Sequence, residues 1–147
     1  MPASADDDDK NRSVDNDKGK RAEIAALQGA NIHIISGMGT TNDNGNPSGL
    51  GNLIIGYDEG PDVLGFSALN AGDRGGSHNL IIGRGNRFTN LAFGGLVAGE
   101  LNTISAEGNT VSGGFNNTAG GQFTVVIGGQ AFTDNRSFSI APNPPFP

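Results

Sequence analysis

Two histidines, together with serine, aspartate and arginine side chains, are the residues of this chain that could do acid–base chemistry. His33 lies in an alternating segment, and His78 stands just before another. A catalytic triad needs Ser, His and Asp to converge in space, and nothing in the spacing selects such a set. We therefore expect both histidines to be structural residues of a strand or a turn.

A polysaccharide-cleaving site, like those on larger parallel β-helices, is a second candidate. It would use Asp73, Arg74, His78 and Arg84, but a solvated loop is the interpretation we favour. Calcium-binding repeats place an aspartate in every turn, where this chain has Asn, Thr or Ala, and neutral amides are poor substitutes for carboxylates. The chain has no cysteine, which excludes thiolate metal sites. We predict no catalytic residue, no cofactor and no metal.

The composition limits the elements that could position any site. Glycine accounts for 25 of the 147 residues, hydrophobic residues for 35%, and tryptophan is absent, so the core must be thin, with backbones in close approach. The net charge of −6 comes without a basic stripe, which argues against nucleic acid as a partner. No apolar run approaches the ~18 residues of a membrane helix, so we expect no membrane insertion.

A short motif recurs along the chain from residue 52 onward. Asn52-Leu53-Ile54-Ile55-Gly56 returns as Asn79-Leu80-Ile81-Ile82-Gly83, and looser copies follow at 96–99, 110–113 and 124–127. Aligned copies give an apolar column of Ile54, Ile81, Val97, Val111 and Val125, and an amide column of Asn86, Asn102, Asn116 and Gln130. A third column contains Phe88, Ile104, Thr118 and Phe132. Such periodic self-similarity is typical of repeat architectures.

The repeat length predicts the geometry of the fold. Each unit has room for two strands of about five residues and two tight turns, and successive units can stack at the ~4.8 Å strand spacing. Frequent β-branched residues and glycines exclude helices here. We predict an all-β parallel β-roll, or β-solenoid, with coils of about 14–16 residues over residues 30–132. In this interpretation 31–36 is a first strand, 37–51 is a loop, and 61–76 fits the register poorly.

The two ends of the chain differ from the repeat region. Residues 1–20 are charged and predicted to be disordered; Asp6–Asp9 with Lys10 has the form of an enterokinase cleavage tag, although a natural acidic tail would look the same. Residues 21–29 predict a short helix, either a frayed turn or the remnant of a coiled coil with Ile24 and Leu27 in its seam. The Pro-rich tail 133–147 either docks on a neighbour through Phe138, Ile140 and Phe146 or is a disordered end.

A coil this thin buries little apolar area, while ordering each residue costs ~1–2 kcal/mol. One face of each coil also carries apolar residues that would otherwise meet water. Lateral association of several copies would cover that face, and we expect a homo-oligomer, with a trimer favoured and a filament as the alternative.

Two of the repeats resemble a known family. Thr124-Val125-Val126-Ile127-Gly128-Gly129-Gln130-Ala131 is similar to the S-V-A-I-G-x-x-A repeat of trimeric autotransporter adhesin heads, and residues 110–120 resemble the related V-S-G-G-x-N-N-T-A-S-G repeat. The resemblance covers roughly residues 78–132. It implies a left-handed parallel β-roll with three chains around a threefold axis, usually joined to a coiled-coil stalk. The leader, stalk and membrane anchor of that family have no counterpart in this sequence.

These observations give two functional hypotheses. The first is a non-enzymatic extracellular or cell-surface protein that attaches to a host matrix protein or a glycan through three identical faces. The second is a structural subunit that stacks end to end into an extracellular filament or forms a phage tail-fibre tip, because open solenoid ends expose unpaired strand edges.

Overall fold

The computed structural model describes residues 14–15, 21–22 and 27–142 of the chain. It divides into two units, 1–33 and 34–147. In the first unit, β1 (Val14–Asp15) pairs antiparallel with β2 (Arg21–Ala22). Within the described residues, the second unit contains strands β3 to β12 and two short 3₁₀ turns, η1 (Asp43–Gly45) and η2 (Pro61–Leu64).

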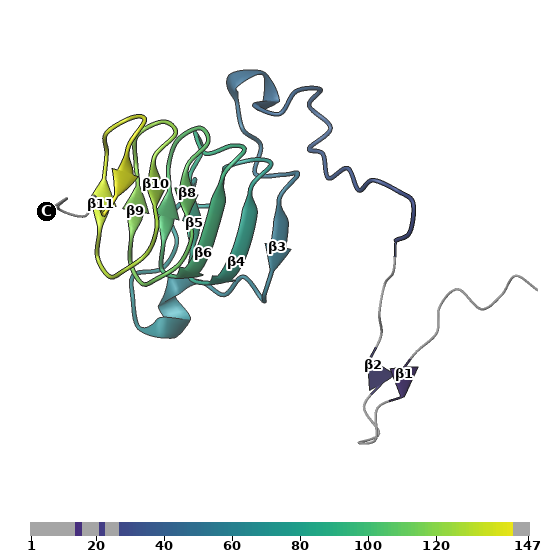
Figure 1. Ribbon diagram of the computed structural model, residues 1–147, viewed down its shortest axis with the longest axis horizontal. Coiled ribbons are helices and arrows are strands. Elements are labelled where there is room, and N and C mark those ends of the chain that lie inside the picture. Colours follow the sequence, from purple (N-terminus) through teal and green to yellow (C-terminus); the bar gives the residue numbers. More distant parts are fainter. Residues whose placement is uncertain (1–13, 16–20, 23–26, 143–147) are drawn as a thin grey trace, which may run out of the picture. The chain divides into compact units, whose positions relative to one another are not determined.

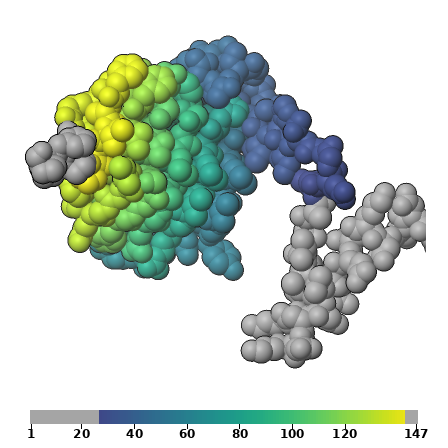
Figure 2. All heavy atoms as spheres, viewed as in Figure 1, coloured from purple at the N-terminus to yellow at the C-terminus, as the bar shows by residue number. Residues whose placement is uncertain are grey.

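The second unit is a parallel β-solenoid of about four coils (Figure 1). One wall is a six-stranded sheet of β3 (Leu53–Ile55), β4 (Leu80–Arg84), β6 (Leu96–Glu100), β8 (Thr110–Val111), β10 (Val125–Val126) and β12 (Ile140–Ala141). The other is a four-stranded sheet of β5 (Arg87–Phe88), β7 (Thr103–Ile104), β9 (Thr118–Ala119) and β11 (Thr133–Asp134). In Figure 2 the colours of the second unit follow sequence order across it, from blue through teal to yellow.

The register of the walls confirms the predicted all-β solenoid. Ile81 pairs with Ile54 on one side and with Val97 on the other, and Val97 pairs with Val111. From β4 onward, corresponding residues of successive coils lie 14 to 16 positions apart, whereas the step from β3 to β4 is 27 residues because a longer loop intervenes. The chain therefore climbs by one strand spacing per repeat, as the periodicity predicts.

The core is a narrow apolar seam between the two walls. The six-stranded wall contributes fully buried Ile81, Val97, Val111 and Val126, and the other wall contributes Phe88, Ile104 and Ala119. Alternation along each strand sends the neighbours of these residues outward. The core is one side chain thick on each wall, as the glycine-rich composition predicts.

Buried asparagines form ladders at the turns between the walls. The N–H of Asn102 donates to Oδ1 of Asn86 at 2.9 Å, and the N–H of Asn117 donates to Oδ1 of Asn102 at 2.8 Å. The side-chain amide of Asn102 in turn donates to the carbonyl oxygens of Ala98 and Gly114. A second series at the opposite turn links Asn52 with Asn79. These bonds satisfy backbone groups that the bend removes from the sheets.

The residue before each ladder position has a positive φ. Leu101, Asn116 and Ala131 have φ of 59°, 56° and 58°, directly before ladder positions 102, 117 and 132. His78 and Phe123 have φ of 55° and 53° at the opposite turn. Each coil therefore turns its corners through left-handed residues, a conformation that costs most residues about 1–2 kcal/mol.

The register corrects the predicted columns in the later coils. Val126 pairs with Val111, so Val126 is the core residue, whereas Val125 pairs with Thr110 and Ile140. Asn117 takes the ladder position predicted for Asn116, and the next ladder bond is made by Phe132, because Gln130 pairs with Phe115 instead. In the third column Ala119 and Asp134 are buried in place of Thr118 and Phe132.

The cause of this error is a one-residue difference in coil length. The sequence alignment assumed a 14-residue step after Val111, but the pairing partner of Val111 lies one position further on. Adjacent identical residues, Val125-Val126 and Asn116-Asn117, conceal the slip. Because side chains alternate with a period of two, a shift of one residue exchanges the inner and outer faces.

The ends of the solenoid also differ from the prediction. Residues 21–22 form strand β2 and 27–29 are not helical, so the predicted 21–29 helix is wrong there. Residues 31–36 are not a strand in the structure, despite their alternation. The solenoid continues beyond 132 through β11 and β12 to Ala141, because the tail 133–141 repeats the strand pattern of the coil before it.

Candidate functional site

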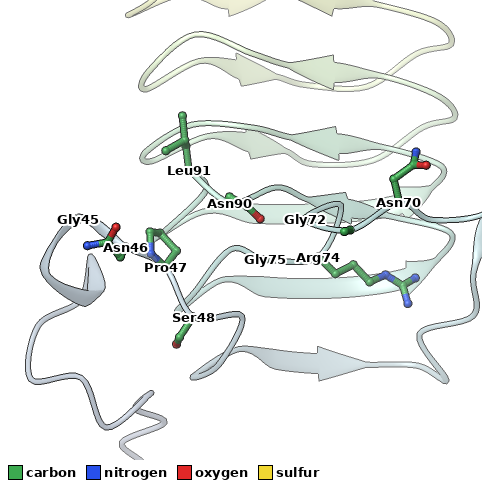
Figure 3. A pocket seen from close by; sticks show the side chains of 11 residues that line it. Gly45, Asn46, Pro47, Ser48, Asn70, Gly72, Arg74, Gly75, Asn90 and Leu91 are labelled. Carbon is green, nitrogen blue, oxygen red and sulfur yellow. The ribbon is translucent and has the colours of Figure 1, made fainter.

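An open pocket of about 640 Å³ lies where three irregular segments meet beside the solenoid (Figure 3). Residues 45–48 come from the segment before β3, residues 70–72, 74 and 75 from the loop before β4, and Asn90 and Leu91 from the turn before β6. The pocket is thus built from positions far apart in the sequence, and no motif marked it.

A buried carboxylate fixes the first of these loops. Asp43 is 1% exposed and accepts hydrogen bonds from the hydroxyls of Ser36, Ser48 and Ser77, and from the N–H of Ser48 at 2.9 Å. Burial alone would raise the pKa of the Asp43 carboxyl, but these donors hold its pKa well below the usual range. Asp43 therefore acts as an ionised clamp between the loop and the coil that carries Ser77.

His78 contributes to the same clamp through both of its ring nitrogens. Its Nδ1 lies 2.8 Å from the carbonyl oxygen of Thr41, which can only accept, and its Nε2 lies 3.1 Å from the N–H of Ser36, which can only donate. This pattern fits the neutral ring with the proton on Nδ1. Both nitrogens are used by backbone groups, so the arrangement supports the structural role predicted for this residue.

Arg74 ties the second loop to the solenoid. Its guanidinium donates to the carbonyl oxygens of Asp58 at 2.7 Å and Glu59 at 2.8 Å, and it lies 3.0 Å from the Asp58 carboxylate. Burial raises the pKa of Asp58 and the Arg74 charge opposes that shift. Figure 3 shows the Arg74 side chain extending away from Asn90 and Leu91. Arg74 lines the pocket, but its donors already have partners elsewhere.

The polar groups that remain in the pocket are neutral. Asn46, Asn70 and Asn90 are exposed at its rim. A Cβ placed on Gly75 would lie 1.9 Å from Oδ1 of Asn90, so the missing side chain of Gly75 makes room for this amide. Amides both donate and accept hydrogen bonds, and Leu91 adds an exposed apolar surface. This combination suits a neutral ligand rich in hydroxyl groups better than an ion.

The four residues weighed for polysaccharide cleavage are not assembled into one site. Asp73 pairs with Arg87 at 3.2 Å, Arg74 with Asp58, and Arg84 with Glu100 at 2.8 Å. His78 is held by backbone groups of Thr41 and Ser36. Within the described ranges, no three His, Asp or Glu side chains gather closely enough to hold a metal ion.

The outward faces of the two walls differ in chemistry. The six-stranded wall presents two apolar rows interrupted by small polar residues, namely Leu53, Leu80, Leu96, Thr110, Val125 and Ile140, and Ile55, Ile82, Ala98 and Ser112. The four-stranded wall presents Arg87, Thr103, Thr118 and Thr133. One face is therefore suited to contact with protein and the other to contact with water.

The residues predicted as oligomer contacts have different surroundings. Leu27 is 64% exposed and Ile140 is 57% exposed. Phe138 stacks on Phe123 of the preceding coil, with ring centroids 5.4 Å apart, so it has a partner within the chain. Ile24 and Phe146 lie outside the described residues.

The fold defines a class of protein, the parallel β-solenoid, in which irregular loops beside the coils form an open pocket. In the part of the chain that the structure covers, no helix has the length and apolar character needed to cross a membrane. Comparison with known protein families, with curated proteins and with solved structures gives no match for this chain.

Proposed function

We propose that this chain is a non-enzymatic attachment protein of the cell surface or extracellular space, in which several copies associate laterally and present identical pockets to a glycan. The observation that carries the proposal is the contrast between the walls. The six-stranded wall has apolar rows facing outward, while the four-stranded wall faces outward with Arg87 and three threonines.

The apolar wall supports self-association. Leu53 is 46% exposed, Ile55 is 52% exposed and Ile140 is 57% exposed, and they belong to rows that run the length of the sheet. Exposed apolar side chains gathered on one wall mark interaction sites in soluble proteins. Copies that pack this wall around a common axis would cover the rows on every chain. The resemblance of residues 110–131 to adhesin-head repeats favours three copies.

The pocket supports a neutral glycan as the ligand. Its exposed side chains are three amides, Ser48, Ala71 and Leu91, and its arginine is already paired. A sugar ring offers hydroxyls to amides and an apolar face to an aliphatic side chain. One such contact is weak, but three pockets at fixed spacing would bind a repetitive polysaccharide with an avidity up to about 10²–10⁴ times the single affinity.

The test combines particle mass with ligand binding. Analytical ultracentrifugation of the full chain should give a trimer, and a glycan array should identify a neutral oligosaccharide. Asn90→Ala removes one rim amide and should weaken array binding at least about tenfold when three pockets act together. Asn116→Gly is the matched control, because it removes an exposed amide from a distant corner whose φ of 56° suits glycine.

The outcomes separate the parts of the proposal. A monomer at all concentrations would contradict the self-association, and array binding that Asn90→Ala leaves unchanged would contradict the pocket. New reducing ends after incubation with the bound polysaccharide would contradict the non-enzymatic assignment.

The filament hypothesis is less well supported by the structure of the last coil. Stacking end to end needs two complementary open ends, but the inward position of β11 holds Asp134, which is 5% exposed and paired with Arg136 and Ser139. A carboxylate satisfied within its own coil gives no apolar surface to a following one. Negative-stain images showing filaments rather than discrete particles would reverse this ranking.

A further inference from the structure

The first strand of the solenoid has one unused edge. Among the described strands β3 pairs with β4 alone. The N–H of Leu53 donates to the carbonyl oxygen of Asn79 at 2.9 Å, toward β4. Successive residues of a strand direct their backbone groups to alternate sides. The N–H of Ile54 therefore points to the opposite, open edge. Ile54 occupies the core column and is nevertheless 39% exposed. A further strand is needed to complete this end.

A segment of the same chain has the character of that missing strand. Residues 31–36 read Asn-Ile-His-Ile-Ile-Ser and are followed by Gly37, a pattern close to the Asn-Leu-Ile-Ile-Gly of β3 and β4. Like sequences pair in parallel throughout this wall. The segment is nevertheless not a strand in the single chain, and Ile35 is 72% exposed.

The position of Ser36 prevents the segment from completing its own solenoid. A Cβ on Gly51 would lie 2.9 Å from the backbone nitrogen of Ser36, and that nitrogen also donates to His78. Ser36 therefore lies before the start of β3. In-register parallel pairing of Ile34 with Ile54 would require Ser36 beside Gly56, about 16 Å further along the strand.

We infer that residues 31–36 of one copy add as a parallel strand to β3 of a second copy, with Ile34 beside Ile54 and Ile35 beside Ile55. This inference rests on the self-association proposed above. Each copy donates one strand and accepts one, so the contacts are head to tail and close into a ring under cyclic symmetry. The exchange would cover the free edge of β3 and give the exposed isoleucines of both segments a partner.

A pair of introduced cysteines tests the register directly. The chain has no cysteine of its own, and residues directly opposite in neighbouring strands lie within the 4.4–6.8 Å Cα separation that a disulfide needs. The full chain carrying Ile35→Cys and Ile55→Cys should form covalent multimers on mild oxidation, seen on non-reducing gels and confirmed by mass spectrometry of the linked peptides. The control carries Ile35→Cys and Thr133→Cys, with Thr133 exposed on the four-stranded wall of the last coil, and should give at least about tenfold fewer multimers.

Each result supports or overturns the inference. Linked peptides 35–55 from different copies support it. A stable oligomer in ultracentrifugation that gives no 35–55 link, or no more than the control pair, overturns the strand exchange and leaves self-association standing. A link within one chain also overturns it, and a chain that stays monomeric overturns both proposals.

A measurement on the unmodified chain guards against effects of the cysteines. Hydrogen exchange of the Ile54 amide should slow at least about tenfold when the chain is concentrated enough to associate, because the donated strand supplies its acceptor. Exchange of this amide that stays fast in the oligomer contradicts the inference independently of any variant.

Discussion

The two ends of the solenoid are closed in different ways. At the β3 end the inward residue is Ile54, which is 39% exposed although its counterpart in β4, Ile81, is fully buried. At the β12 end the same inward position holds Ala141, which is 7% exposed. The first end therefore presents a full-sized apolar core residue, while the last end has reduced the core to a methyl group.

The opposite wall extends this contrast. Its inward residues become smaller and then polar along the stack, from Phe88 and Ile104 to Ala119 and Asp134. Asp134 accepts from Nε of Arg136 at 3.0 Å and from the hydroxyl of Ser139 at 2.7 Å, and the bonds from Arg136 hold its pKa well below the usual range. A solenoid can thus end where the inward side chains of its last coil are small or paired within that coil, while an end that keeps an exposed isoleucine in its core column still needs a partner.

The largest expected effect is the difference in destabilisation between two alanine substitutions in the same core column, one in the middle of the solenoid and one at its open β3 end. Ile81→Ala should lower the free energy of unfolding by about 2–5 kcal/mol, the range for buried large-to-small substitutions. Ile54→Ala should cost less than half as much in dilute solution, because Ile54 is already partly solvated. Urea denaturation followed by circular dichroism measures both.

Repeating the two denaturation measurements at a protein concentration at which copies associate tests whether a second copy covers the β3 end. If a second copy covers β3, the cost of Ile54→Ala should rise toward that of Ile81→Ala as the chain associates. Equal costs in the dilute monomer would contradict the description of β3 as an open end.

The next effect concerns the amide ladder as it approaches the closed end. Asn117→Ala should destabilise the fold by about 1–3 kcal/mol, because it removes the acceptor of the Phe132 N–H and the side-chain donor to the carbonyl oxygen of Gly113. The adjacent variant Asn116→Gly should stay within about 0.5 kcal/mol of the parent. If urea denaturation showed Asn116→Gly to be more destabilising than Asn117→Ala, the ladder residue would be Asn116, as the sequence alignment predicted.

Acid should weaken both ends through two different carboxylates. Asp43 near the open end and Asp134 at the closed end have pKa values depressed by hydrogen bonds. Their ionised forms stabilise the fold above the unfolded pKa of about 3.9, and this contribution is lost as the pH falls from there toward the folded-state values. We expect the melting temperature to be lower at pH 3 than at pH 7.

Two variants test how much each end of the solenoid contributes to the loss of stability in acid. Asp43→Asn and Asp134→Asn should each reduce the difference in melting temperature between pH 7 and pH 3, and hydrogen exchange should show local opening at the corresponding end. Variants with the full acid response of the parent would show that these carboxylates do not govern it.

The smallest effect concerns the aromatic pair at the closed end. Phe138→Ala should destabilise the fold by about 0.5–1.5 kcal/mol, the contribution of a stacked aromatic pair, because Phe138 stacks on Phe123. It should leave the sedimentation coefficient of the oligomer unchanged. Dissociation caused by this variant would instead identify Phe138 as a contact between copies, as the sequence suggested.

Much of the candidate site could not have been predicted from local sequence. Asn46, Asn70 and Asn90 come from three irregular segments whose meeting depends on how loops fold over the coils. The clamp at Asp43 joins serines at positions 36, 48 and 77, and nothing in their spacing distinguishes them from other serines. Loop conformation is set by such long-range bonds, and periodicity carries no information about them.

The sequence by itself determined the architecture, because a repeated strand motif with glycine corners can bury its isoleucines and valines only by stacking on itself in parallel. It also determined the early columns, because the motif Asn-Leu-Ile-Ile-Gly recurs unchanged at 52–56 and 79–83 and so aligns Ile54 with Ile81. Only the tertiary structure decided between Val125 and Val126, and between Asn116 and Asn117, because one extra residue in a turn changes which face a side chain occupies and two adjacent like residues fit either register. Only the structure, too, separated the closed end from the open one, because that difference depends on whether a buried group finds its partners within its own coil.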